Sequence, residues 1–163
     1  MSPITYNSPL IALAVLICSV TCYAAMDMLG RVRRSRTRAK SSWLLAGACV
    51  LATGIWATHF VSMMALELPF VLGHEIDLTL ASWLAGLVAT LIVFYVSSRS
   101  ALSAWAILAA AIPVATSTCA LFYLGNLSLQ LTPAIVYLPL PTATTALAFY
   151  LVVAASMWIA HRL

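Results

Sequence analysis

The sequence predicts an all-α protein, a polytopic bundle of five transmembrane helices that forms one domain over residues 1–163. Hydrophobic residues make up 64% of the chain and charged residues only 7%, with a mean hydropathy of +1.05. A soluble domain carries about 25% charged residues. The apolar residues are grouped in long runs, and none alternates in the manner of a membrane β-barrel strand. This pattern excludes an ordinary soluble enzyme.

Five apolar segments are long enough to cross a bilayer as helices. A hydrocarbon core of about 30 Å requires about 20 apolar residues, and a helix satisfies its own backbone hydrogen bonds in lipid. The predicted spans cover about residues 9–29, 43–66, 78–96, 102–125 and 134–160. Because Pro139 and Pro141 interrupt the start of the last span, we expect its helix to begin nearer Thr142.

The basic residues predict the orientation of the chain. All eight Lys and Arg residues fall on one side of the predicted bundle, six of them in a predicted cytoplasmic loop, 31–40. The loops of the other side carry acidic residues and no basic ones. The positive-inside rule therefore places the amino terminus outside and the carboxy terminus in the cytoplasm. The residues behind this assignment are Arg99 and Arg162 on the inside, and Glu67, Glu75 and Asp77 on the outside.

The basic loop also predicts partners for the chain. Besides the bilayer itself, we expect anionic lipid headgroups to contact residues 31–40, since each basic residue near a membrane surface contributes about 1 kcal/mol. Docking of a cytoplasmic protein on the loop is the alternative. The basic residues are confined to one short loop instead of a folded face, which argues against nucleic-acid binding.

Two ionisable side chains lie within the spans. Asp27 is near the cytoplasmic end of its helix, and we expect it to pair with Arg31, four residues further along. His59 is deeper, roughly 10 Å from the outer end of its helix, and shares a helical face with Met63. An imidazole and a thioether are ligands that favour copper, Cu(I) in particular.

The metal-site prediction needs further ligands. His74, in the following outer loop, is the third ligand that we expect. Other candidate ligands are Met64, Glu67 and Cys119. The alternative is that His59 is a hydrogen-bonded packing residue and Met63 one of the methionines that commonly fill apolar helices.

The stretch around His59 resembles a known family. The segment Gly54-Ile-Trp-x-x-His-Phe-x-x-Met63, the Arg-rich loop before it and the sequence Tyr23-Ala-Ala-Met-Asp27 are similar to the MHYT domain of bacterial integral membrane sensors. The resemblance implies repeated helix pairs, copper held by Met and His residues near the outer face, and sensing of a diatomic gas. It also implies a bacterial inner membrane and, in many members, attached cytoplasmic domains that make or degrade cyclic di-GMP.

This copy departs from the family pattern in both repeats. Thr58 and Ser62 replace the first Met and the Gly of the motif that contains His59. The segment Leu121-Phe-Tyr-Leu-Gly-Asn126 aligns with the second motif, where Phe122 replaces the His. The repeat nevertheless predicts that His59 and Phe122 lie at equivalent places in two similar helix pairs.

The sequence contains no recognisable catalytic constellation, so we expect no enzymatic activity. Three functions stay open. The first is a sensor module that binds copper and responds to a diatomic gas or to redox state. The second is a structural or assembly subunit with a decayed metal site, and the third is a small transporter. A sensor without its own output domain requires a protein partner or a homo-oligomer.

Overall fold

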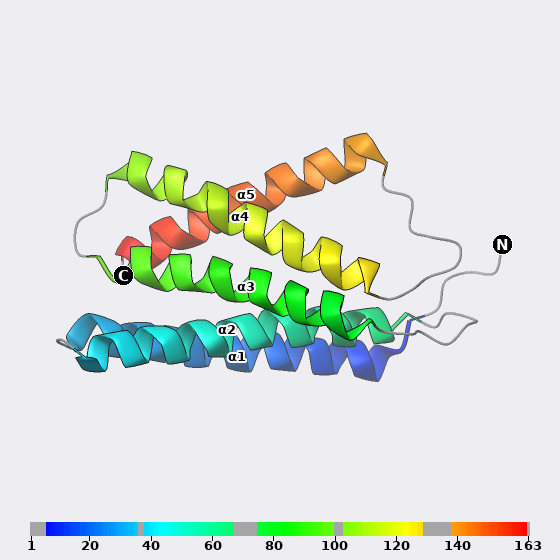
Figure 1. Ribbon diagram of the computed structural model, residues 1–163, viewed down its shortest axis with the longest axis horizontal. Coiled ribbons are helices and arrows are strands. Elements are labelled where there is room, and N and C mark those ends of the chain that lie inside the picture. The colour runs from blue at the N-terminus through cyan, green and yellow to red at the C-terminus, as the bar shows by residue number, and fades with distance from the viewer. Residues whose placement is uncertain (1–5, 36–37, 67–74, 100–102, 129–137, 163) are drawn as a thin grey trace.

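The computed structural model describes residues 6–35, 38–66, 75–99, 103–128 and 138–162. These residues form a bundle of five long helices, each apolar enough to cross a membrane (Figure 1). The fold class therefore agrees with the prediction. The helices are α1 (Ser8–Arg34), α2 (Arg38–Met64), α3 (Ile76–Ser97), α4 (Ala104–Leu127) and α5 (Pro139–Arg162).

Much of the predicted cytoplasmic loop 31–40 is helical. Helix α1 continues to Arg34 and α2 begins at Arg38. Arginine is a good helix former, and the arginines in the last turn of α1 interact favourably with the negative end of its dipole. The predicted pair is present, with Arg31 Nε 2.8 Å from Asp27 Oδ2. We call this part of the molecule the basic end.

Helix α5 begins earlier than its two prolines predict. It starts at Pro139 and not near Thr142. The first-turn amides of a helix have no intrahelical partner, so the missing N–H groups of Pro139 and Pro141 cost no hydrogen bond. The amide of Thr142, the first non-proline residue after Pro141, donates to the Leu138 carbonyl at 3.0 Å.

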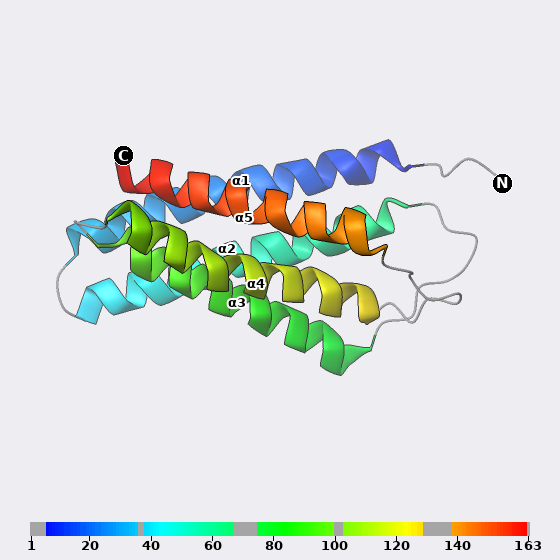
Figure 2. The same ribbon diagram turned by 90° about the horizontal axis from the view of Figure 1, so that it is seen from above.

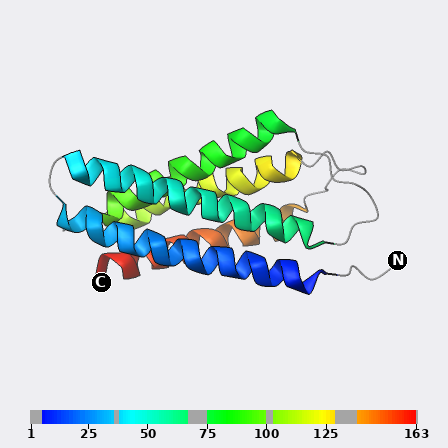
Figure 3. The ribbon, with the colours of Figure 1, turned by 90° about the horizontal axis from the view of Figure 1, so that it is seen from below.

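The helices pack as antiparallel neighbours in chain order. Figures 1 and 2 show α1 beside α2, α3 between this pair and α4, and α5 packed against α4 and α3. Figure 3 shows α1 and α2 side by side from below. Helix α1 begins and α5 ends at opposite ends of the bundle (Figure 1), as five passes require. Next to the amino terminus, the Asn7 amide donates to the Ala65 carbonyl at 2.9 Å and ties the start of α1 to the end of α2.

Glycines allow the helices to approach closely. A Cβ added at Gly47 would overlap the Phe94 ring of α3, and one at Gly54 would overlap the side chain of Thr21 of α1. A Cβ added at Gly86 would likewise overlap the side chain of Leu121 of α4. Small residues at interfaces are the usual means by which membrane helices pack, because lipid offers no hydrophobic driving force between them.

Hydroxyl and indole groups add polar links between helices. The buried Thr90 hydroxyl on α3 donates to the Ala48 carbonyl of α2 at 2.9 Å. The Trp56 indole on α2 donates to Ser82 Oγ of α3 at 3.1 Å, and Trp83 on α3 donates back to Thr53 on α2 at 3.2 Å. Such bonds align α2 and α3 along the side that carries the candidate site.

Candidate functional site

His59 lies in the second-last turn of α2, at the end of the bundle away from the arginines. Helix α2 ends at Met64, so five residues, or about 7.5 Å of helix, separate His59 from that end. The imidazole is 9% exposed, which makes it the only buried ionisable side chain among the described residues. A titratable group held inside a membrane bundle is costly and is typical of a functional position.

Aromatic rings enclose the imidazole. The Phe122 ring of α4 meets it edge-to-face with centroids 4.9 Å apart, and the Phe60 ring meets it at 5.3 Å. Phe149 of α5 packs in turn against Phe122, with centroids 5.7 Å apart. The repeat predicted equivalent places for His59 and Phe122, and the contact between their rings puts the two residues at a similar depth on α2 and α4.

Gly125 of α4 lies beside the imidazole. A Cβ at Gly125 would lie 2.7 Å from His59 Nε2 and 3.0 Å from its Cδ2. Because glycine has no Cβ, the ring of His59 can occupy the space that a side chain at position 125 would fill. The sequence contained a signal for this close approach. Gly125 retains the glycine of the second repeat motif, although Phe122 replaces the histidine of that motif.

Two polar atoms at the site lack partners in the structure. Nε2 of His59 and Oγ1 of Thr58 are buried and have no hydrogen-bond partner among the described residues. A buried polar atom without a partner costs about 1–3 kcal/mol. In the tautomer that carries its proton on Nδ1, Nε2 has a lone pair that no hydrogen bond from the described residues occupies, as a ligand atom requires.

The other predicted ligands are placed less favourably. Met63 is half-buried one turn beyond His59, whereas Met64 is 58% exposed and belongs to the outer surface of the bundle. Cys119 is half-buried on α4, one turn before Phe122. Glu67 and His74 lie outside the described residues. Within the described part of the chain, no three His, Cys, Asp or Glu side chains come together.

Trp56 lies one turn before His59 on a similar face of α2. Its ring packs on Phe60 with centroids 4.7 Å apart, and its indole is held by Ser82. Helical spacing tells which residues share a face but not which neighbouring helix that face meets. The hydrogen bond to α3 decides the orientation of Trp56.

The chain is similar to known signalling proteins. The sequence model of the MHYT family, described as "Bacterial signalling protein N terminal repeat", matches residues 53–111, which include His59. A bifunctional diguanylate cyclase/cyclic di-GMP phosphodiesterase, MucR of Pseudomonas aeruginosa, is 36% identical over 67% of this chain. The cyclic di-GMP phosphodiesterase NbdA of the same organism is 38% identical over 58% of it. The signaling protein YkoW of Bacillus subtilis is 27% identical over 70%.

The similarity is confined to a small part of each relative. The matched segments make up 14% of MucR, 12% of NbdA and 14% of YkoW. No solved structure matches the chain at a significant level. The shared region therefore corresponds to a membrane-spanning signalling unit within much longer proteins.

Proposed function

Because the chain belongs to the MHYT family of bacterial membrane signalling domains, we propose that it senses a chemical signal through copper bound at His59. The observation that carries this proposal is the buried Nε2 of His59, which faces Gly125 and has no hydrogen-bond partner among the described residues. In this proposal, neutral imidazole is the ligating form, and Met63 supplies a thioether from the same face.

The donor set fits Cu(I) better than a hard cation. Thioether sulfur is a soft ligand and imidazole nitrogen suits copper, and the rings of Phe60 and Phe122 pack against the imidazole. With two protein ligands on one helix, a third is expected from His74 in the segment that follows α2. Cys119 is a further candidate from α4. A bound Cu(I) would supply a site that reacts with oxygen or another diatomic gas, or that changes oxidation state.

The signal requires a receiver. The names of MucR and NbdA describe enzymes of cyclic di-GMP turnover, and we infer that an output of this class, on a partner or an attached domain, receives the signal. The chain itself acts as the sensor and performs no catalysis. We place it in the bacterial inner membrane, with the basic end in the cytoplasm.

The test is copper stoichiometry after anaerobic loading with Cu(I). Purified wild-type chain is compared with His59→Ala and with the matched control His161→Ala, which changes the histidine near the end of α5. We expect about one copper per chain in the wild type and the control, and a loss in His59→Ala. Fewer than about 0.2 copper per wild-type chain, or equal binding by His59→Ala, contradicts the proposal.

The third ligand is tested in the same way. His74→Ala is expected to retain copper with lower affinity, because His59 and Met63 remain. Met63→Leu keeps the shape of the side chain but removes the sulfur, so it is expected to weaken Cu(I) binding without changing the helical content. If neither variant changes copper affinity, His59 binds the metal with a different ligand set.

A further inference from the structure

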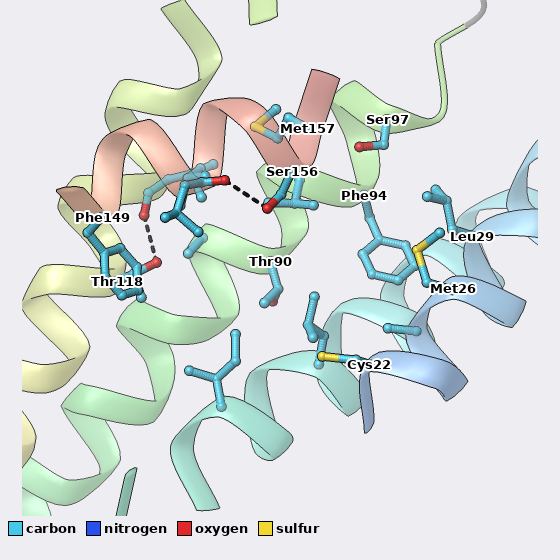
Figure 4. Close-up of a pocket in the computed structure, with 18 residues that line it drawn as sticks. Cys22, Met26, Leu29, Thr90, Phe94, Ser97, Thr118, Phe149, Ser156 and Met157 are labelled. Carbon is cyan, nitrogen blue, oxygen red and sulfur yellow. Dashed lines mark hydrogen bonds between the residues drawn. The ribbon is translucent and has the colours of Figure 1, made fainter. Parts of the chain in front are cut away.

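An apolar cavity of about 360 Å³ lies within the bundle (Figure 4). All five helices contribute to it, and it extends from the middle of the bundle toward the basic end. Its lining is almost entirely hydrocarbon and sulfur. Representative lining residues are Cys22, Met26 and Leu29 of α1, Phe94 of α3, and Phe149 and Ser156 of α5.

The cavity opens sideways, between α1 and α5. Lining residues from both of these helices are also surface residues, among them Cys22 and Met26 on α1 and Val152 on α5. The outer surface of α1 and α5 is the surface that a bilayer covers, because only 11% of each apolar window is buried inside the bundle. The cavity therefore faces hydrocarbon chains instead of water.

A cationic group lies where the cavity reaches the basic end. Arg33 follows Cys22, Met26 and Leu29 at helical spacing, so it continues the stripe of α1 that lines the cavity. Its Nε donates to the carbonyl of Ser97, another lining residue, at 3.1 Å. The exposed guanidinium is thus held over the seam between α1 and α3, and its planar fork suits a phosphate group.

We infer that the cavity binds one anionic phospholipid, with an acyl chain between α1 and α5 and the phosphate at Arg33. The apolar lining matches an acyl chain, and the guanidinium of Arg33 matches the phosphate. A single acyl chain is narrow enough to enter and restores the dispersion contacts that the lining of a void loses.

Native mass spectrometry of the full chain tests this inference without any metal. Delipidated protein in detergent receives equal amounts of dioleoyl phosphatidylglycerol and dioleoyl phosphatidylcholine, and the retained lipid is counted. Ser156→Phe places a ring in the cavity mouth. Ser19→Phe is its matched control, because both serines are exposed on outer helices and donate to the carbonyl four residues earlier.

We expect one phosphatidylglycerol per wild-type or Ser19→Phe chain, and a loss of retention in Ser156→Phe. Arg33→Gln should reduce the preference for phosphatidylglycerol about fivefold, whereas Arg38→Gln, an exposed arginine at the start of α2, should leave it unchanged. If Ser156→Phe does not fold, Val152→Phe obstructs the same cavity. Equal retention of both lipids, equal retention by the two phenylalanine variants, or a lipid-free dimer overturns the inference.

Discussion

Gly125→Ala should disturb the bundle because it places a methyl group against the imidazole of His59. The added Cβ would lie 2.7 Å from Nε2 and 3.0 Å from Cδ2, which is inside van der Waals contact, so the ring or the α4 backbone must move. Overpacking of this kind costs about 1–3 kcal/mol. The substitution also contributes about 1 kcal/mol of helix propensity, so the net change in unfolding free energy is about 0–2 kcal/mol of destabilisation.

Gly30→Ala is the matched control for this effect. A Cβ at Gly30 meets only Nη2 of Arg34, at an ordinary 3.5 Å, so the variant gains the helix propensity without the overlap. The free energy of unfolding is measured in mild detergent with increasing SDS and followed by far-UV circular dichroism. We expect Gly125→Ala to be less stable than Gly30→Ala by about 1–3 kcal/mol.

A double-mutant cycle shows whether the imidazole is the cause. His59→Ala removes the ring that the new methyl group strikes, so Gly125→Ala should cost less in that background, with a coupling of about 1–3 kcal/mol. Equal stability of the two glycine variants, or a cost at Gly125 that persists without the imidazole, would refute the reasoning. In either case the space beside Gly125 would not be set by His59.

Three further predictions follow from the same structure. Phe122→His places a second imidazole at a ring position 4.9 Å from that of His59. Cu(I) affinity should rise about tenfold or more, because groups outside the first ligand shell already change metal affinity on that scale. Competition with a chromogenic chelator measures the affinity. Thr90→Val removes the hydroxyl that donates to α2 and should cost about 0.6–1.7 kcal/mol in the same SDS unfolding assay. For topology, Ser35→Cys should react with an impermeant maleimide only in inverted vesicles and Asn7→Cys only in intact cells, and the reverse pattern would overturn the orientation.

Hydropathy alone predicted the architecture, because each apolar segment satisfies its backbone within one helix and needs no knowledge of its neighbours. Helix ends were harder to predict. The arginines of segment 31–40 mark the edge of the membrane, but they do not mark the end of α1, since a helix continues into water as long as its residues favour it. Pro139 misled for the opposite reason, because a proline that breaks a helix interior is well tolerated in a first turn.

The site was predicted in part. The repeat brought His59 opposite Phe122 because equivalent positions in similar helix pairs fall at similar depths. The sequence could not indicate that Trp56 binds Ser82, since that depends on the rotation of α2 against α3. The cavity at Phe149 was equally hidden, because it arises from the separation of α1 and α5, which no local pattern encodes.

The glycines at the helix contacts restrict how the helices can move against one another. Between α1 and α2, α2 and α3, α3 and α4, and α4 and α2, one side chain rests in the notch of one glycine. Sliding any of these helices along its axis would lift a bulky group out of its notch, whereas a small tilt pivots about it. Helix α5 contains no glycine and, in the described structure, fills none of these notches. In the described structure, helices α1 to α4 are thus held in axial register by these notches, whereas α5 packs on α3 and α4 without one.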